Sequence, residues 1–429
     1  MINPRTKQRE LCYVVNIDRI EPIVGSDNCE AAVVGGWRVM TRKGTFQAGD
    51  KAVYFEIDSK VPETETFAFL APKHYKVKTQ KYTFGGKGNF ISQGLLMSLE
   101  DFKDNWGRVP TWLAVFNLKV TNASITKAAG GEEEIEIPYF LTKELGVTYS
   151  VAEDNKRKSN ITKYDKMYQR HLKLFKKYKI LRTIYSKQWG KKLLFLFLGK
   201  KRDTRTWPVG RFPGVSKTDQ ERIENMTWVL EDKTPYVKTL KVDGTSGTFI
   251  LEKKPFKKYE YYVCSRNVRM INENQSNYHA DDENVYWEAS IKYHIQEFLQ
   301  DLIERNNLEW AALQGEIAGV SEKGRGIQGD PHKLKKLRFF GFHLTDSNRG
   351  RYPQIEAKKL CNEYGIEWVP IIDDNYILPN DLTEFKNTAD GKCEIEGSSG
   401  LREGYVYYNT KQPNMSFKNV SNEYLLGRN

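Results

Sequence analysis

The chain has 429 residues, of which 39% are hydrophobic and 28% are charged. This length exceeds a single ordinary core and predicts two or three domains, and the composition is typical of a soluble globular protein. The longest apolar run, Leu193 to Leu198, is too short to cross a membrane, and no signal peptide opens the chain. We therefore expect a cytoplasmic protein without a membrane partner.

The cysteines also favour a reducing, cytosol-like compartment. The five cysteines are scattered, odd in number and include no Cys-x-x-Cys pair, and the six histidines are equally dispersed. This pattern indicates reduced thiols and argues against a zinc site.

Residues 11–135 are rich in strand-like sequence. Short runs of β-branched and aromatic residues alternate with Gly-containing turns. These runs are Tyr13–Ile17, Ala31–Val34, Trp37–Met40 and Lys51–Ile57. Short strands at this spacing predict a small β-barrel or sandwich. A structural β-domain without a ligand is the alternative.

The net charge of +12 is concentrated in the next part of the chain. Residues 156–205 hold 18 Lys or Arg and only two acids, Asp165 and Asp203, so the remainder is slightly acidic. An apolar and aromatic stripe with steps of three and four residues predicts an amphipathic helix here. The stripe consists of Tyr164, Met167, His171, Leu174, Tyr178, Leu181 and Tyr185.

We interpret this segment as a basic arm that contacts the phosphates of a nucleic acid, because so much charge repels itself unless a polyanion neutralises it. The alternative is an ordinary surface helix, whose apolar stripe packs on a core and whose charged face is solvated. A helix lying on a membrane surface is a third.

Strands and helices alternate from Trp207 onward. Glu283–Asn306 has the apolar face of one long helix, and Tyr352–Tyr364 is a second helix with Pro353 near its start and Gly365 after its end. This pattern predicts a mixed α+β domain of about 220 residues. The predicted parts are a nucleic-acid-binding β-domain (1–149), a basic helical linker or insertion (150–205) and the α+β domain (206–429).

Lys241-Val242-Asp243-Gly244 follows the apolar-ended run Tyr236–Leu240. A Lys-x-Asp-Gly at the end of a strand is typical of enzymes that attach a nucleoside monophosphate to the lysine. Alone the motif is weak, but five more short motifs follow in order, each at the beginning or end of a strand-like run. They are Ser265–Asn267, Gln314–Glu316, Phe339–Leu344, Glu403–Val406 and Ser416–Asn419.

Each residue type in these motifs suits nucleotidyl transfer. The amine of Lys241 attacks phosphorus only when neutral, so burial or a nearby cation must lower its pKa. Glu316 and Glu403 are candidate ligands of the divalent metal that spreads charge as pyrophosphate leaves. Lys418 is suited to neutralising the α-phosphate in the transition state.

An aromatic ring such as Phe342 is suited to stacking on a purine, and Arg266 to binding a ribose hydroxyl or a phosphate. Taken singly, the two glutamates are also typical strand-end surface acids. Phe340 and Phe342 have the period-2 spacing of core residues, and the two cations are typical of solvated surface. The joint occurrence of all motifs in one order favours the functional interpretation.

These motifs, in this order, resemble the covalent nucleotidyltransferase superfamily of ATP-dependent ligases and capping enzymes. Within this superfamily the chain most specifically resembles the RNA ligases that have an N-terminal OB domain and seal 3′-OH/5′-phosphate nicks in RNA-containing duplexes. It spans residues 10–135 and 206–425. The stretches that carry the narrower likeness are Gly44–Asp50, Val53–Asp58, Ile91–Leu96, Lys217–Ile223, Gly326–Pro331 and Ser416–Asn422.

The resemblance implies an OB-type β-barrel domain followed by a mixed α/β nucleotidyltransferase domain. It also implies three steps: a lysine attacks ATP and becomes a lysyl-adenylate, AMP passes to a 5′-phosphate of RNA, and a neighbouring 3′-OH displaces AMP. ATP and Mg²⁺ (or Mn²⁺) would be the cofactors, and nicked RNA-containing duplex the partner. We expect a monomer with no obligate protein partner.

The resemblance also implies roles for single residues. Lys241 would be the nucleophile, Lys418 would bind the α-phosphate, and Leu240 would line the nucleotide site beside Lys241. The remaining roles are ribose binding by Arg266 and Glu316, adenine stacking by Phe342 with Phe340 as second choice, and metal binding by Glu403, Glu316 and Asp243.

Three residues depart from the family pattern. His343 follows Phe342 where an Asp is usual, Ser416 replaces the first lysine of the last motif, and Leu240 stands where an acid is common. The basic segment 150–205 has no counterpart in the family that we can place. None of these departures removes a group that the chemistry requires.

Two other classes of function fit part of the pattern. Capping enzymes and ATP-dependent DNA ligases share the lysine motif, but they place an OB domain after the catalytic domain, whereas here the β-domain comes first. A catalytically inactive nucleic-acid-binding protein on the same scaffold would suit the basic arm. Such a binder has no need of Lys241, Glu316, Glu403 and Lys418 together.

Overall fold

The computed structural model describes most of the chain. The described residues are 1–3, 6, 8–84, 88–104, 107–128, 138–149, 168, 174, 177–198, 210–216, 220–266, 268–270 and 284–427. No helix among them has the length and apolar character needed to cross a membrane.

The N-terminal domain is built from short antiparallel strands around two cores. Its central sheet has the order β10-β1-β5-β9, and β2-β3-β4, β7-β8 and β6-β11 form smaller sheets. The strands are β1 (Cys12–Asn16), β2 (Arg19–Pro22), β3 (Cys29–Val34), β4 (Trp37–Arg42), β5 (Lys51–Phe55), β6 (Ser59–Lys60), β7 (Gln80–Thr83), β8 (Asn89–Ser92), β9 (Leu95–Ser98), β10 (Tyr139–Phe140) and β11 (Thr148–Tyr149).

The alternating side chains of β1 explain why this domain needs two cores. Tyr13 and Val15 face one core, where they meet Trp37 of β4. Cys12 and Val14 face the other, which is covered by the helix α1 (Thr111–Ala128). The four predicted strand runs are all confirmed, with ends that differ by up to two residues.

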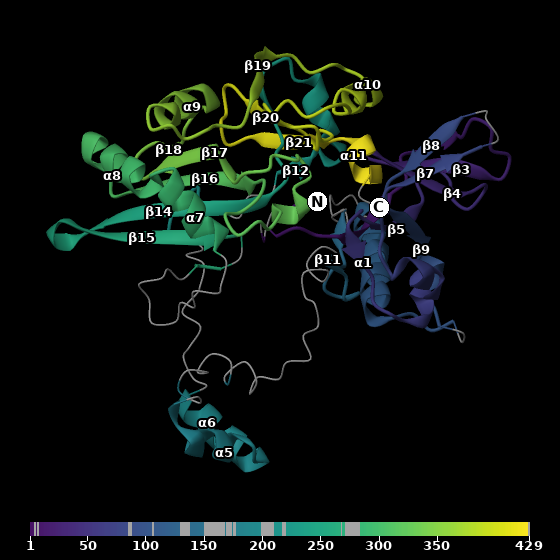
Figure 1. Cartoon of the computed structure of the whole chain (residues 1–429). Helices are drawn as coiled ribbons and strands as arrows, with labels where there is room; N and C mark the ends of the chain where they lie inside the picture. Colours follow the sequence, from purple (N-terminus) through teal and green to yellow (C-terminus); the bar gives the residue numbers. More distant parts are fainter. Residues whose placement is uncertain are drawn as a thin grey trace.

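The C-terminal domain consists of two five-stranded sheets, ordered β12-β21-β20-β13-β19 and β15-β14-β16-β17-β18. Figure 1 shows them as two layers. The strands are β12 (Glu221–Arg222), β13 (Tyr236–Leu240), β14 (Thr245–Lys254), β15 (Lys258–Ser265), β16 (Trp310–Ala318), β17 (Arg338–Asp346), β18 (Gly350–Arg351), β19 (Ile371–Tyr376), β20 (Gly404–Asn409) and β21 (Ser416–Val420).

Helices cover the outer faces of these sheets. Helix α8 packs on β14 and β16, and α9 packs on β17. The helices of this domain are α7 (Val285–Lys292), α8 (Ile295–Asn306), α9 (Gln354–Asn362), α10 (Leu382–Asn387) and α11 (Asn422–Gly427). The helix predicted over Tyr352–Tyr364 is confirmed as α9, which Pro353 precedes.

The prediction of a single helix over Glu283–Asn306 is wrong. The backbone of His294 adopts the left-handed conformation with φ of 49°, which ends α7 and starts α8 in a new direction. Both helices contribute to the same core, but Ile291 of the predicted apolar face is exposed beside the break, so periodicity alone did not reveal it.

The basic segment is described only in part. Helices α5 (Lys179–Tyr185) and α6 (Gln188–Leu198) pack on each other around Leu194. The predicted continuous helix is interrupted, because Tyr178 has an extended backbone. Most of the stripe before Tyr178 lies outside the described residues. The boundaries of the three predicted parts of the chain stay predictions.

A network of buried polar groups joins the N- and C-terminal domains. Glu56 is fully buried, pairs with Arg9 at 2.8 Å and accepts a hydrogen bond from Asn225 Nδ2 at 3.1 Å. The backbone N–H of Gly36 donates to the carbonyl of Glu224 at 2.7 Å, and a Cβ on Gly36 would lie 2.5 Å from Glu224 Cα. The two domains therefore meet through matched surfaces.

Candidate active site

The Lys241–Gly244 turn carries the chain from one sheet of the C-terminal domain to the other, since it connects β13 to β14. The backbone N–H of Lys241 donates to the carbonyl of Gly404 at 2.9 Å. At the other end of the turn, a Cβ on Gly244 would lie 2.2 Å from the carbonyl oxygen of Ile317, so this position requires glycine. Lys241 is thereby held between the two sheets.

The side chain of Lys241 forms an ion pair with Glu403, which directly precedes β20. Nζ lies 2.7 Å from Oε1 of Glu403, and both side chains are mostly buried. Burial alone would lower the pKa of Lys241, but Glu403 and Glu316 together raise it above its ordinary value. The lowered pKa that we expected from the sequence is therefore not present in this arrangement.

Glu316 lies in the same electrostatic cluster, on β16. Burial raises its pKa to about 8, and the charges of Asp243 and Glu403 act in the same direction. The ammonium of Lys241 and the exposed guanidinium of Arg266 act in the opposite direction. Glu316 is thus surrounded by two acids, Asp243 and Glu403, and two cations, Lys241 and Arg266.

Asp243 is held by two residues that sequence reasoning missed. Its backbone N–H donates to Nε2 of His332 at 2.8 Å, and its carboxylate accepts a hydrogen bond from the hydroxyl of Tyr424. His332 and Tyr424 lie one and two residues beyond the motif-like stretches that end at Pro331 and Asn422. No local pattern distinguishes them, because they reach Asp243 only through the tertiary fold.

Lys418 and Leu240 occupy buried positions in the β12-β21-β20-β13-β19 sheet. Lys418 is opposite Val406 in the β20–β21 pair, so the two side chains share one face. Lys418 is 7% exposed, which is unusual for a lysine and excludes the solvated surface cation that we considered. Leu240 is 1% exposed and belongs to the main core.

The two candidate stacking residues differ in environment. Phe340 pairs with Glu316 across β16 and β17, which places both on one face, and the guanidinium of Arg338 lies 4.8 Å from the centre of its ring. Phe342 is the extra residue at a β-bulge in β17 and is only partly buried. Partial exposure leaves its ring better available for stacking than that of Phe340, which is 1% exposed.

His343, the departure from the family pattern, is 3% exposed. Its ring lies edge-to-face against Phe342 at 5.0 Å and against Tyr408 of β20 at 5.6 Å. Neither ring nitrogen has a hydrogen-bond partner among the described residues. Burial lowers the pKa of His343, and Arg351 adds to this effect. A neutral, apolar-packed ring therefore occupies the position where an acid is usual.

The predicted metal ligands are Glu316, Glu403 and Asp243. In the part of the chain that the structure describes, no three His, Cys, Asp or Glu side chains are arranged to hold a metal. Glu403 is paired with Lys241 and Asp243 with Tyr424 instead. However, Oε2 of Glu403 is buried without a hydrogen-bond partner, and such an orphaned carboxylate oxygen fits a cation. This oxygen is one donor that a divalent metal could use, and the role of each predicted ligand stays a prediction.

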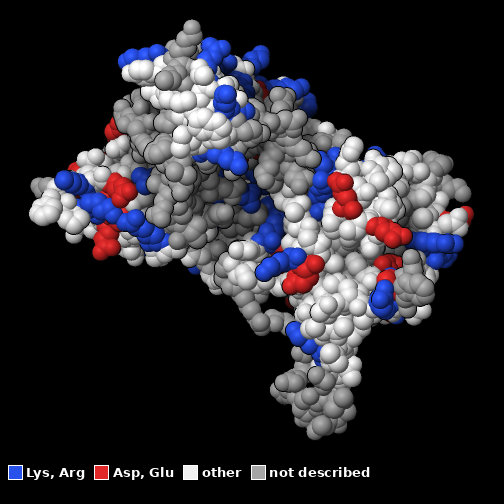
Figure 2. All heavy atoms as spheres, turned by 90° about the horizontal axis from the view of Figure 1, so that it is seen from below, with Lys and Arg blue, Asp and Glu red and all other residues white. Residues whose placement is uncertain are grey.

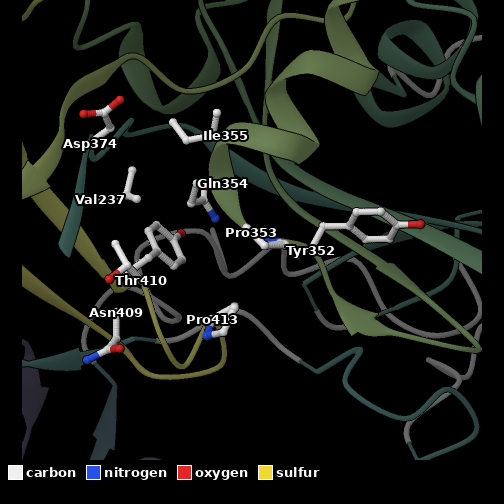
Figure 3. Close-up of a pocket in the computed structure, with 10 residues that line it drawn as sticks. Val237, Tyr352, Pro353, Gln354, Ile355, Asp374, Asn409, Thr410 and Pro413 are labelled. Carbon is white, nitrogen blue, oxygen red and sulfur yellow. The ribbon is translucent and has the colours of Figure 1, made fainter. Parts of the chain in front are cut away.

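A cavity of about 240 Å³ lies at the other end of β13 (Figure 3). Its lining comes from β13, β19, β20 and the residues at the start of α9. These residues are Val237, Tyr352, Pro353, Gln354, Ile355, Asp374, Tyr408, Asn409, Thr410 and Pro413. Asp374 is the one charged residue among them, so this cavity is not suited to binding phosphate groups.

Models of two known protein families match this chain, one in each of its two domains. Residues 234–420 match the RNA ligase family, and residues 11–99 match an OB-fold domain. The candidate active site therefore lies in an RNA ligase domain, which follows an N-terminal OB-fold domain. This confirms the family resemblance and the predicted fold class. No match was found among curated proteins.

The chain is also similar to solved structures of an RNA ligase from Naegleria gruberi. The form with PPi is 24% identical, with a TM-score of 0.66 and coverage of 98% of this chain and 99% of that chain. A mutant with ATP and Mn has the same values, and a mutant with AMP and Mn is 23% identical with a TM-score of 0.64. The likeness shows a shared fold over nearly the whole length of both chains.

Proposed function

We propose that this RNA ligase forms a lysyl-adenylate at Lys241 and seals nicks in RNA-containing duplexes. The observation that carries the proposal is the placement of Lys241 between the two sheets, 2.7 Å from Glu403 and in the electrostatic field of Glu316. A structural lysine gains little from two partly buried carboxylates. A nucleophile that must be oriented and later deprotonated requires such neighbours.

In the first step the neutral amine of Lys241 attacks the α-phosphorus of ATP, a P–N bond forms and pyrophosphate leaves. The 5′-phosphate of RNA then displaces the lysine and takes AMP. Finally, a 3′-OH attacks the activated 5′-phosphorus, and AMP departs. Lys418 would bind the α-phosphate oxygens, since it is a buried cation two strands away from β13.

The other site residues would bind and orient the nucleotide. Arg266 and Glu316 would bind the ribose, Phe342 or Phe340 would stack on the adenine, and Leu240 would close the core below the nucleotide. A divalent metal held by Glu403 and Glu316, with Asp243, would supply charge neutralisation at the phosphates. The carboxylates would release Lys241 from its ion pair when they bind another cation.

The Naegleria structures support the choice of ligands. Those proteins were solved with ATP, AMP, PPi or Mn, which are the substrate, products and a metal of the proposed chemistry. The shared fold makes the same ligand classes a reasonable expectation for this chain. The N-terminal OB-fold domain and the basic segment would then bind the nucleic acid strand. Figure 2 shows Lys and Arg side chains beside the hollow between the two lobes of the molecule.

Covalent labelling tests the nucleophile. Incubation with ATP labelled in the α-phosphate should give a labelled protein, and Lys241→Ala should abolish the label. Lys253→Ala, at an exposed position of neighbouring β14, is the matched control and should label normally. Persistent labelling of the Lys241→Ala protein would overturn the assignment. Labelling by GTP in place of ATP would instead favour the capping enzymes.

A nick-sealing assay tests the substrate. RNA and DNA strands are exchanged on each side of a nick in a duplex, and the joined product is measured. We expect sealing to require an RNA-containing nick with a 3′-OH and a 5′-phosphate. Equal sealing of all-DNA nicks would favour a DNA ligase, and binding without labelling or sealing would favour an inactive nucleic-acid-binding protein.

A further inference from the structure

A buried imidazole lies directly against the nucleophile turn. His332, in the loop between β16 and β17, is fully buried. Its Nε2 lies 2.8 Å from the backbone nitrogen of Asp243, two residues after Lys241. Its Nδ1 lies 3.3 Å from Sγ of Cys393, in the loop between α10 and β20. One ring therefore connects the turn to a loop about 150 residues away in sequence.

The hydrogen bonds determine which ring nitrogen carries the proton. A backbone N–H is always a donor, so Nε2 of His332 accepts and carries no hydrogen. In the neutral ring the proton is therefore on Nδ1, which donates to Sγ of Cys393. Because Nε2 carries no hydrogen in this arrangement, the ring is in its neutral form.

The ring is itself held in place by its neighbours. The hydroxyl of Ser398 donates to the carbonyl of His332 at 2.7 Å, and the N–H of Cys393 donates to the carbonyl of Gly400 at 3.1 Å. A Cβ on Gly400 would lie 2.2 Å from the carbonyl oxygen of Pro331, so the two loops are in direct backbone contact. This packing leaves the imidazole little freedom to move away from Asp243.

We propose that His332 is a positioning residue for lysine adenylation, and that Cys393 sets the tautomer this role requires. Two backbone N–H groups then hold the turn: that of Lys241 donates to the carbonyl of Gly404, and that of Asp243 donates to Nε2 of His332. These bonds direct the amine of Lys241 toward the space between the sheets. His332 does not contact the reacting atoms, so it is not a catalytic residue. The inference rests on the proposed function.

Replacing His332 tests the accepting group. His332→Leu removes the acceptor and leaves a buried N–H unpaired, whereas His332→Gln keeps an oxygen near the position of Nε2. Single-turnover labelling with ATP should be about tenfold or more slower in His332→Leu and close to wild type in His332→Gln. Equal loss in both variants, or no loss in His332→Leu, would overturn the proposal.

A second reaction separates positioning from general damage to the site. Joining of a pre-adenylated RNA strand to a 3′-OH strand, without ATP, requires no attack by Lys241. His332→Leu should therefore retain this joining within about twofold while losing lysine labelling. A parallel fall in both reactions would indicate a merely structural histidine. If the wild-type protein is never labelled by ATP, the proposed function fails, independently of His332.

Cys393 offers a test of the tautomer. Without a sulfur acceptor, the ring is free to carry its proton on Nε2, where it would face the N–H of Asp243. Cys393→Val should therefore slow the labelling of Lys241 by ATP, as His332→Leu does. Cys393→Ser keeps an acceptor and should not slow it. Cys361→Val, a change at a fully buried thiol in α9, is the control and should label normally. Equal labelling rates for Cys393→Val and Cys393→Ser would contradict the role of Cys393.

Discussion

Lys241 and Glu403 form an ion pair of 2.7 Å in which both partners are mostly shielded from water. This pair opposes the effect that burial has on the amine of Lys241. Burial on its own favours the neutral amine, but the carboxylates of Glu403 and Glu316 outweigh it and raise the pKa of Lys241. The protein without nucleotide therefore holds Lys241 protonated, and in the proposed reaction this pairing must be lost before the amine attacks.

Replacing Glu403 should make the lysine more reactive toward simple reagents. With Glu403→Gln, burial dominates and the pKa of Lys241 falls, so a larger fraction of the amine is neutral at pH 8. We expect faster modification of Lys241 by an amine-reactive acylating reagent, measured by peptide mass spectrometry without ATP or metal. Lys253 serves as the internal reference. Slower modification of Lys241 in the variant would contradict the pKa argument.

Glu316 should make the stability of the metal-free protein depend on pH. Its pKa is raised from 4.5 to about 8, so between these values the folded state binds a proton that the unfolded state lacks. The free energy of unfolding therefore falls as the pH rises from 4.5 to 8. Glu316→Gln removes this loss of stability. The difference in Tm between the variant and wild type should therefore be larger at pH 8.5 than at pH 5. We expect an increase of about 2–4 °C for each kcal/mol of unfolding free energy that the variant gains. A Tm difference that does not change with pH would contradict this.

Glu56, at the interface between the two domains, should give the free energy of unfolding the opposite dependence on pH. Burial would raise the pKa of Glu56, but Arg9 and the amino group of Met1 lower it from 4.5 to about 2. Its stabilising effect is present above pH 4.5 and is lost as the pH falls toward 2. Glu56→Gln should lower the free energy of unfolding by about 3 kcal/mol at pH 7 and by less below pH 4.

Asp58 provides the control for that measurement. Asp58 is 3.4 Å from Arg222 at the same interface, but its side chain is 30% exposed. Exposed pairs contribute about 0–1 kcal/mol. Asp58→Asn should therefore change the unfolding free energy in urea much less than Glu56→Gln. Similar losses in the two variants would mean that burial does not determine the strength of these pairs.

The basic segment should contribute affinity and not chemistry. Residues 177–198 include six Lys or Arg and no acid, and Trp189 between them is 60% exposed. Deleting residues 156–205 should weaken RNA binding and flatten the slope of log K against log salt, by about 0.9 for each phosphate that the segment neutralises in the intact protein. Charge reversal of Lys187 and Lys192 should give a smaller change of the same sign.

Lysine labelling by ATP is the control for the basic segment. It should be unchanged in the deletion and in the charge-reversal variant, because the described site residues all lie outside residues 156–205. Loss of labelling in the deletion would mean that the segment supports the fold of the ligase domain.

Much of the architecture could be predicted because it depends on local patterns. Alternating side chains identified β1 and β3 to β5, and the apolar face with Pro353 before it identified α9. The break between α7 and α8 could not be predicted, since it depends on one left-handed residue, His294, within an unbroken apolar period. The interruption at Tyr178, whose backbone is extended, was missed because it also lies within an apolar period.

The sequence by itself determined the identity and order of the groups that the proposed chemistry needs, because each motif lies in or beside a strand that short-range patterns reveal. The tertiary structure alone decided how these groups affect one another. It paired Lys241 with Glu403, raised the pKa of Glu316 by burial among other acids, and placed His332 and Tyr424 against Asp243. Charge and hydrogen bonding act through space, and these partners are separated by 89 to 181 residues along the chain.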